Sequence, residues 1–321
     1  MICSARSKLS PFLVTGSHRS GTTWVGRLLA RAPGIAYVNE PFRPDQRPGI
    51  FDPGFDRWFA HAPDYNEERI RSELNRVLSL KYSLSNELKS ISSIRDLLRM
   101  GRDAGCFIVK RIQAERVLLK DPIAVLSSSW IAEKFGACVV VMVRHPAAFT
   151  YSLKRKGWTF PFDHLLGQPR LMEEHLGPFK QEIARFSDQS QPISAQAGLL
   201  WAVIYHVVSK FLDEHSDWIV VRHEDLARDP VGGFCDLYER LGLSYTPSCR
   251  RAVVEASRSD NPTEPKNKAK DIHRDSQGLI GRWRNGLDQG KIATVREYTE
   301  QVADRWYDQS TWRRSKTGAP E

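Results

Sequence analysis

The most informative segment of this chain is Pro11-Phe-Leu-Val-Thr-Gly-Ser-His-Arg-Ser-Gly-Thr-Thr-Trp24. Its apolar run 12–14 predicts a short buried strand of a parallel sheet. Gly16 and Gly21 then bracket four residues, a spacing typical of loops whose backbone N–H groups bind phosphate at the start of a helix. A nucleotide-binding P-loop has a lysine directly after the second glycine, and Thr22 stands there instead. Because that lysine normally reaches the β- and γ-phosphates, the segment predicts a nucleotide with one 5′-phosphoryl unit in place of a β,γ-polyphosphate.

Side chains around this glycine loop strengthen the interpretation. Arg19 lies within the loop and can supply positive charge from another direction, and Thr22 and Thr23 add two hydroxyl groups. A turn rich in glycine and serine can also join a strand to a helix without binding anything. The combination of glycines, a cation and paired threonines favours an anion site over that purely structural role.

A second candidate anion site follows the apolar run 138–143, which predicts another buried strand. Arg144 comes directly after this run, and Ser152 lies two turns into the helix that Pro146 is expected to begin. Ligands of open α/β sheets bind at the carboxyl ends of the strands. We therefore expect Arg144 and Ser152 to face one anion, close to the glycine loop.

Together the two motifs resemble the sulfotransferases that use 3′-phosphoadenosine-5′-phosphosulfate (PAPS). The phosphosulfate loop of that family reads Pro-Lys-Ser-Gly-Thr-Thr-Trp, and this chain has His18-Arg-Ser-Gly-Thr-Thr-Trp24, with Arg19 at the position of the lysine. The resemblance implies that PAPS is the sulfuryl donor, that no metal is needed, and that Arg144 and Ser152 hold the 3′-phosphate. The residues that it implies for the 5′-phosphosulfate are His18, Arg19, Ser20, Gly21, Thr22 and Thr23.

Two later segments extend the resemblance, which covers about 10–41, 117–155, 200–245 and 274–285. Arg222-His-Glu-Asp-Leu226 is similar to a Tyr-Glu-Asp-Leu segment of the family, with His223 in place of a tyrosine near the adenine. Gly278-Leu-Ile-Gly-Arg-Trp-Arg-Asn285 resembles the C-terminal Gly-x-x-Gly-x-Trp-Lys-Asn motif, which implies nucleotide contacts from Gly278 and Arg282. The family has Arg-Lys before this motif and this chain has Ser276-Gln277, so Arg274 or Arg282 would have to substitute.

The candidate general base is Glu40. Sulfuryl transfer needs a group that removes the acceptor proton and groups that neutralise charge on the leaving oxygen. Cytosolic members of the resembled family use the histidine of Lys-Thr-His, which Lys120-Asp121-Pro122 lacks. Carbohydrate-type and bacterial members use a glutamate downstream of the phosphate loop, which implies Glu40 as the base, Asp121 as the second choice, and catalytic roles for Arg19 and Lys120 at the leaving group. A turn carboxylate that pairs with Arg43 is the structural alternative for Glu40.

The remaining sequence alternates between predicted strands and helices, the pattern of a parallel sheet with helices on both faces. We predict one α/β domain over residues 1–321, with a P-loop-like sheet, a mainly helical cap insertion at about 43–103 and a nucleotide-closing loop at about 257–285. The apolar run 106–110 predicts a further strand. Helical periodicity in the cap predicts two packed apolar faces, formed by Ile70, Leu74, Val77 and Leu78, and by Ile91, Ile94, Leu97 and Leu98.

Composition excludes several classes of protein. The 321 residues are 41% hydrophobic and carry a formal net charge of +9, but no helix-turn-helix, zinc-finger or RNA-binding signature accompanies the basic residues, so nucleic acid is not an expected partner. No apolar run is predicted to cross a bilayer, and residues 1–10 lack the apolar core of a secretion signal. These features predict a cytoplasmic enzyme without a transmembrane segment, while peripheral membrane contact and the oligomeric state stay open.

The acceptor is the least defined part of the prediction. The resemblance to carbohydrate-type members favours a carbohydrate or glycolipid hydroxyl, with an amine or another small molecule as alternatives. Aromatic side chains can stack on sugar rings, and they can equally pack in a core. The candidates are Phe51, Phe55, Trp58, Phe59, Tyr65, Trp158, Phe160 and Phe162.

Two other functions compete with sulfuryl transfer. A P-loop kinase for small molecules would need Mg²⁺ and ATP, but Thr22 replaces its lysine, and Arg144 follows the strand where an acidic metal ligand is expected. A non-catalytic nucleotide-binding module would keep the loop without a base, and the presence of Glu40 weighs against it.

Overall fold

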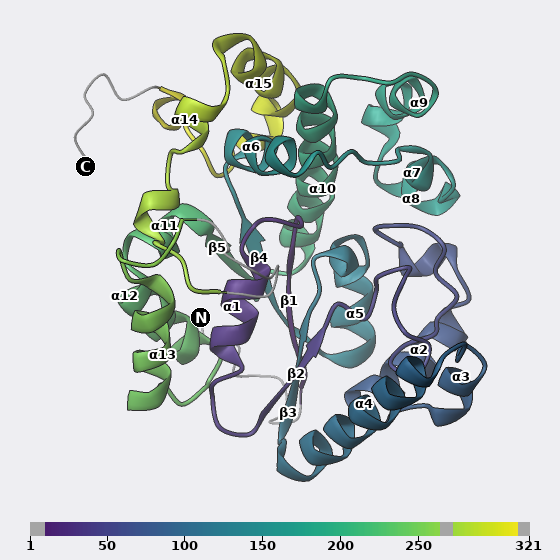
Figure 1. Ribbon diagram of the computed structural model, residues 1–321. Helices are drawn as coiled ribbons and strands as arrows, with labels where there is room; N and C mark the ends of the chain where they lie inside the picture. Colours follow the sequence, from purple (N-terminus) through teal and green to yellow (C-terminus); the bar gives the residue numbers. More distant parts are fainter. Residues whose placement is uncertain (1–9, 264–271, 314–321) are drawn as a thin grey trace.

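The computed structural model describes residues 10–263 and 272–313. At its centre lies a five-stranded sheet in the order β2-β3-β1-β4-β5, in which all neighbouring strands are parallel (Figure 1). This confirms the predicted α/β fold. The strands are β1 (Phe12–Gly16), β2 (Ile35–Asn39), β3 (Arg116–Lys120), β4 (Cys138–Val143) and β5 (Ile219–Arg222).

Successive side chains of the strands point into two apolar cores, one on each face of the sheet. On β1, Phe12 and Val14 belong to one core and Leu13 to the other, as the two-residue period of a strand requires. Both faces are covered, which explains why the strands are continuously apolar. The first core contains α1 (Thr22–Leu29), α12 (Pro230–Arg240) and α13 (Pro247–Ser257), and the second contains α5 (Ser128–Phe135), α6 (Pro146–Lys156) and α10 (Ile193–Glu214).

Helix α10 lies at the centre of the second core. By length and composition it could cross a membrane, and in the described ranges it is the one helix that could, but 72% of its apolar window is buried inside the protein. It packs against α6 and α15 (Gln289–Ala303). Trp201 and Tyr205 of α10 are completely buried. Such burial is that of a core helix in a globular protein.

The insertion between β2 and β3 holds the 3₁₀ turn Ala62–Asp64, α2 (Glu67–Leu78), α3 (Leu84–Leu88) and α4 (Ile94–Gln113), which lie together to one side of the sheet (Figure 1). The α2 face packs as predicted, with Ile70, Leu74 and Val77 fully buried. The second predicted face is wrong. Its members Ile94, Leu97 and Leu98 are exposed large hydrophobic side chains.

The predicted strand at residues 106–110 is also wrong, because these residues form the last turns of α4. A short apolar run fits a buried strand or a helix equally well by periodicity. Here the helix begins at the N-cap Ser93, whose side chain accepts from the Asp96 N–H, and runs on to Gln113. Within the run only Phe107 is buried, and Cys106 is exposed. The helical insertion therefore continues past residue 103, almost to the start of β3.

Short elements complete the described chain, and part of the predicted closing loop, residues 264–271, lies outside it. The 3₁₀ turns are Ile123–Ser127, Gly177–Phe179, Gln277–Leu279 and Gln309–Trp312, and the remaining helices are α7 (Asp163–Leu166), α8 (Pro169–Glu174), α9 (Lys180–Asp188), α11 (His223–Arg228) and α14 (Trp283–Gly286).

Candidate active site

The carboxyl ends of all five strands deliver candidate residues to one edge of the sheet. The strands are in parallel register there, with Asn39 beside Lys120 and Val143 beside Arg222. In an open α/β sheet this edge is where ligands bind. The candidate residues are Glu40 after β2, Lys120 and Asp121 at the end of β3, residues 17–21 after β1, Arg144 after β4, and His223 after β5.

The glycine loop needs both of its glycines. Gly16 has φ of 130°, and a Cβ placed there would lie 2.2 Å from the Met142 carbonyl oxygen of β4. Gly21 has φ of 102° and is the N-cap of α1, and a Cβ there would lie 2.7 Å from Nδ1 of His223. Both conformations are ones that glycine adopts without strain. The loop therefore packs tightly against β4 and His223, and α1 begins with Thr22 and Thr23, whose N–H groups point out of the helix start.

Tyr205 of α10 anchors the loop, a role that no sequence motif indicated. Its hydroxyl donates to the Met142 carbonyl oxygen at 2.7 Å and accepts from the Ser17 N–H at 3.2 Å. Ser20 closes the turn through its hydroxyl, which donates to the Ser17 carbonyl oxygen at 2.6 Å. Burial raises the pKa of Tyr205 to about 12, so the phenol stays protonated at neutral pH. A tyrosine within an otherwise apolar helix is the one sequence signal that could have suggested a buried hydrogen-bond anchor.

The two predicted anion sites lie side by side. Arg19 Nε donates to Ser152 Oγ at 2.9 Å, and Arg144 Nη1 donates to the Arg19 carbonyl oxygen at 2.8 Å. Arg19 adopts a positive φ of 65°, a strained conformation for a side-chain-bearing residue that is frequent at functional sites. Trp201 Nε1 donates to the Arg144 carbonyl oxygen at 2.8 Å, which fixes the end of β4. The structure thus brings Arg19, Arg144 and Ser152 together across the sheet.

The electrostatics of this cluster are those of an anion site. Burial lowers the pKa of Arg19 to about 10, with further repulsion from Arg144, Arg155 and Arg274. Burial likewise lowers the pKa of Arg144, whose Nε is buried without a hydrogen-bond partner. Among the residues that the structure describes, no carboxylate forms an ion pair with Arg19 or Arg144. The charge of the buried Glu224 raises the pKa of Arg144 and offsets part of this positive charge. Two buried guanidinium groups beside one carboxylate still favour a bound anion, and they fit the phosphate groups of a nucleotide.

His18 lies in an aromatic environment beside the loop. Its ring contacts Phe59, Phe149 and Trp158, with centroid separations of 5.7, 5.2 and 6.3 Å. Burial lowers the pKa of His18 to about 4, and Arg19 adds repulsion. The imidazole is therefore neutral at physiological pH. Through Phe59 the insertion between β2 and β3 contacts the glycine loop.

His223 is buried against the start of α1. Its ring lies 5.9 Å from that of Trp24, edge to face, and neither ring nitrogen has a partner within the described ranges. Burial lowers the pKa of His223 well below its ordinary value, with repulsion from Arg144. Trp24 Nε1 is also buried without a partner. Unsatisfied buried donors and acceptors beside Gly21 are consistent with a ligand that supplies hydrogen bonds there.

Glu40 and Lys120 form an ion pair on the other side of the loop. The Lys120 side chain is 1% exposed and the Glu40 side chain 21%, so the carboxylate is the partner that reaches solvent. Burial lowers the pKa of Lys120, and the charge of Glu40 opposes this shift. Arg43 Nη1 lies 3.5 Å from Glu40, so the pairing expected for a turn carboxylate is also present, but the Lys120 contact is closer. Glu40 has a positive φ of 47°, a second strained non-glycine residue at this edge.

Asp121 is completely buried, and backbone donors occupy both of its oxygens. Oδ2 accepts from the Phe42 N–H at 2.6 Å, and Oδ1 accepts from the N–H groups of Ile123 and Ala124 at 2.9 and 3.2 Å. Burial raises the pKa of Asp121 to about 7. The side chain ties the loop after Glu40 to the segment after β3. This positioning role was not visible in the sequence, because its donors come from two separate segments.

The C-terminal candidates lie on a segment that packs against α6. Gly278 N–H donates to Asp275 Oδ1 at 2.9 Å, and Arg282 Nη1 donates to the Thr263 carbonyl oxygen at 3.4 Å. Trp283 of this segment stacks on His145, the N-cap of α6, with ring centroids 4.9 Å apart. Arg274 is the residue of this region whose charge acts on Arg19. The segment thus closes over the helix that carries Ser152.

Four of the eight aromatic candidates for acceptor binding are core residues. Phe42, Phe51 and Phe55 form one buried cluster, and Phe59 and Phe162 are buried as well. The large exposed aromatic of this region is Trp158, whose ring lies 5.8 Å from the Arg19 guanidinium. It lies where an acceptor could meet the phosphate loop.

Two sequence comparisons found relatives of this chain. The model of the Sulfotransferase family matches residues 11–247. Over 78 residues the chain is 33% identical to carbohydrate sulfotransferase 5 of Mus musculus, which covers 24% of this chain and 20% of that protein. The chain therefore matches about a fifth of the length of this curated relative.

A solved sulfotransferase domain shows the same fold. The sulfotransferase domain from the curacin biosynthetic pathway is 16% identical, with a TM-score of 0.51 over 92% of this chain and 97% of that chain. A mouse sulfotransferase, SULT7A1, complexed with PAP, is 12% identical, with a TM-score of 0.45 over 94% of this chain and 86% of that chain.

Proposed function

We propose, from the premise that this chain belongs to the sulfotransferase family, that it transfers a sulfuryl group from PAPS to a hydroxyl or amine of an acceptor, with Glu40 as general base. The observation that carries this proposal is the contact between the two anion sites, in which Arg144 donates to the Arg19 carbonyl oxygen and Arg19 donates to Ser152. One doubly phosphorylated nucleotide can neutralise both groups at once.

The donor would be held at both ends by residues of this chain. The N–H groups at the start of α1, the hydroxyls of Thr22 and Thr23 and the guanidinium of Arg19 would bind the 5′-phosphosulfate. Arg144 and Ser152 would bind the 3′-phosphate, and His223 and Trp24 offer a buried apolar surface with free ring nitrogens to the base. Bound PAPS supplies the activated sulfuryl group.

Geometry favours Glu40 over Asp121 as the base. Both oxygens of Asp121 accept backbone N–H groups, and the side chain is fully buried. Glu40 is partly open to solvent and shares Oε1 with Lys120. Its Oε2 has only the longer contact with Arg43 Nη1, at 3.5 Å, and would be the oxygen that takes a proton. In the transfer the acceptor oxygen forms a bond to sulfur as its proton passes to Glu40, and the bond from sulfur to the 5′-phosphate oxygen breaks. Arg19 and the loop N–H groups would stabilise the charge left on that oxygen, and Lys120 keeps Glu40 oriented.

A carbohydrate or glycolipid hydroxyl is the proposed acceptor. It is supported by the carbohydrate sulfotransferase among the relatives and by Trp158, an exposed ring beside Arg19 that could stack on a sugar.

The test is an assay with radiolabelled PAPS and, separately, radiolabelled ATP, each with and without EDTA, over a panel of glycans, glycolipids, phenols and amines. We expect label from PAPS to reach an acceptor in the presence of EDTA, and no label from ATP. Transfer from ATP that EDTA abolishes would instead identify a kinase. Binding of PAPS without transfer to any acceptor of the panel, by wild type and Glu40→Gln alike, would favour a non-catalytic module.

A further inference from the structure

The outer face of α3 and α4 is the largest concentration of exposed apolar side chains in this protein. Of the ten large hydrophobic side chains that are exposed in the described ranges, eight lie on these two helices. The most exposed are Ile112 at 80%, Ile94 at 79% and Leu98 at 70%. We call this set the α3–α4 face, and its members are Leu84, Leu88, Ile94, Leu97, Leu98, Ile108, Val109 and Ile112.

The α4 members share one side of the helix. At about 100° per residue, its six exposed apolar residues fall within an arc of about 120°. Phe107, which is buried, and Asp103, which contacts Arg47, lie outside this arc and face the protein. The helix is therefore amphipathic with its apolar side directed away from the molecule. Contiguous exposed apolar surface of this kind marks an interaction site.

Charges around the α3–α4 face are positive. Lys89, Arg95, Arg99, Arg102 and Arg111 are all exposed, and on the helical wheel Arg95 and Arg102 border one edge of the arc and Arg111 approaches the other. The acidic residues of the two helices lie outside this arc. A helix that combines an apolar face with flanking lysine and arginine is the pattern of a helix that lies in a membrane interface.

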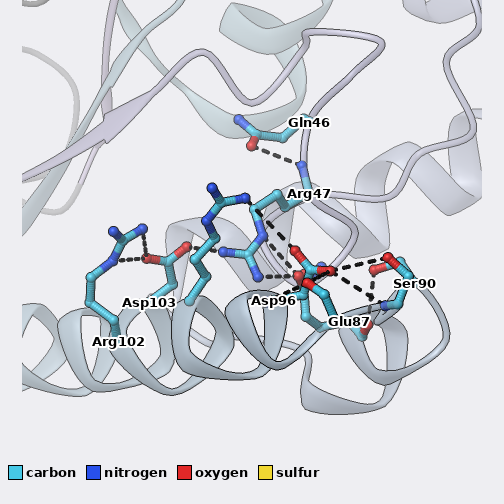
Figure 2. A network of polar contacts seen from close by, with 11 residues as sticks. Gln46, Arg47, Glu87, Ser90, Asp96, Arg102 and Asp103 are labelled. Carbon is cyan, nitrogen blue, oxygen red and sulfur yellow. Dashed lines mark hydrogen bonds and ion pairs between the residues drawn. The ribbon is translucent and has the colours of Figure 1, made fainter.

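Three carboxylates are withdrawn from this surface by contacts within the protein. Glu87 is buried and pairs with Arg47, which also donates to Asp103 at 2.6 Å (Figure 2). Asp96 is occupied at the start of α4, where its carboxylate accepts from the Ser93 hydroxyl at 2.7 Å. Asp96 also lies 3.7 Å from Arg99, and Asp103 accepts from Arg102 Nε at 2.8 Å, so these two arginines are paired. Within the described residues the exposed Lys89, Arg95 and Arg111 form no ion pair, and their charge complements an anionic lipid surface.

Arg47 also connects these helices to the candidate active site. It follows Gln46, whose Nε2 donates to the Glu40 carbonyl oxygen at 2.8 Å. Gln46 Oε1 accepts from the Arg47 N–H at 2.9 Å (Figure 2). The loop after β2 is thus fastened to α3 through Glu87 and to α4 through Asp103. A surface bound to the α3–α4 face would be held at a fixed position relative to Glu40.

We propose that the α3–α4 face docks this protein on an anionic lipid bilayer, with α4 lying in the interface and its arginines on the lipid headgroups. A second copy of the chain is the competing occupant, because Gly101 and Gly105 lie near the middle of the face and leave room for a close helix. Two such faces brought together would set like-charged rims against each other, and an anionic surface would neutralise them. The inference rests on these contacts and does not depend on the proposed reaction.

The experiment is co-sedimentation of the purified chain with phosphatidylcholine vesicles, with and without phosphatidylglycerol. We expect binding to the anionic vesicles that weakens as salt is added. The combined variant Leu98→Ser, Ile108→Ser and Ile112→Ser should bind at least about tenfold more weakly, and Arg95→Gln with Arg111→Gln about fivefold more weakly per arginine on anionic vesicles. The matched control is Val254→Ser, at an exposed valine of α13, which should bind as wild type does.

Light scattering of the wild type and the triple serine variant without lipid completes the test. The substituted side chains are exposed, so thermal unfolding of the variant should match that of the wild type, and Glu40→Gln should bind vesicles normally. A wild type that ignores anionic vesicles, or a serine variant that binds them as well as wild type does, would overturn the proposal. A dimer that the serine substitutions dissociate, in a protein that does not bind vesicles, would overturn it in favour of a second copy.

Discussion

Two groups of charged residues lie at the same edge of the sheet, and they differ in how their charge is balanced. At the ends of β1 and β4, Arg19 and Arg144 are buried close together and form no ion pair within the described residues, although the charge of the nearby Glu224 carboxylate raises the pKa of Arg144 and so offsets part of their charge. At the ends of β2 and β3, Lys120 and Glu40 neutralise each other. The first group keeps a net positive charge that a bound anion would neutralise. In the second group the two charges neutralise each other without a ligand. This difference is the basis on which we propose that one side of the loop binds the nucleotide and the other carries out the chemistry.

The largest effect is expected from Glu40→Gln, which removes the proton acceptor but leaves the shape of the pair. General-base catalysis contributes about 10²- to 10⁴-fold, so turnover should fall by that amount while binding of adenosine 3′,5′-bisphosphate, measured by calorimetry, stays near that of the wild type. Asp45→Asn is the matched control, since Asp45 is an exposed carboxylate on the same loop. Near-normal turnover by Glu40→Gln would show that Glu40 is not the general base.

The next effect should come from Arg144→Ala and should appear in binding. Charge-assisted hydrogen bonds contribute about 1.5 to 3 kcal/mol, so the affinity for adenosine 3′,5′-bisphosphate should fall by about 10- to 100-fold, with Arg144→Lys intermediate. The control is Arg240→Ala, at an arginine that pairs with Asp236 on α12. If Arg144→Ala binds the nucleotide as tightly as the wild type does, Arg19 and Arg144 do not form the nucleotide site.

A smaller effect is expected on the stability of the protein at acidic pH. The pKa of His18 is lowered by burial to about 4, so between pH 6.5 and about 4 the unfolded chain binds a proton there that the folded chain does not. The free energy of unfolding should therefore fall as pH decreases through this window, by about 1.4 kcal/mol per pH unit for one such histidine. His18→Asn should reduce this slope in urea titrations, and His273→Asn, at an exposed histidine, should not. If His18→Asn keeps the slope of the wild type, a proton on His18 beside Arg19 and Arg144 does not lower the free energy of unfolding.

Ser152→Ala should have the smallest effect. The hydroxyl accepts from Arg19 Nε, and a single hydrogen bond contributes about 1 kcal/mol, so nucleotide affinity should fall about fivefold. Ser209→Ala is the control, because the Ser209 hydroxyl bonds within its own helix. A loss as large as that of Arg144→Ala would mean that Ser152 positions Arg19 for the whole site.

Sequence was sufficient for the features that local patterns encode. The glycine loop, the strand before Arg144 and the spacing from Arg144 to Ser152 each follow from a few adjacent residues, and the parallel sheet then places them together. Residues 106–110 were misassigned because an apolar run does not distinguish a strand from a helix. The outward face of α4 was misassigned for a related reason, since periodicity identifies an apolar side but not what covers it.

The roles of Tyr205 and Asp121 depended on contacts that no local pattern encodes. Tyr205 bonds to Ser17 from a helix that is distant in the sequence. Asp121 accepts from the Phe42 N–H and from the N–H of Ile123, two residues after Asp121 itself. Such residues are recognised only when the strand order is known, because their partners are neighbours in space alone.

The tight packing at Gly16 has a consequence for which nucleotides fit. Because Gly16 lies directly against Met142 and Tyr205 bonds to both Met142 and Ser17, the separation between the loop and Arg144 is set by main-chain register. The separation between the two phosphates that the site can hold is therefore fixed. Adenosine 2′,5′-bisphosphate, which has the same charge but a different span between its phosphates, should therefore be a poor substitute for the 3′,5′ isomer.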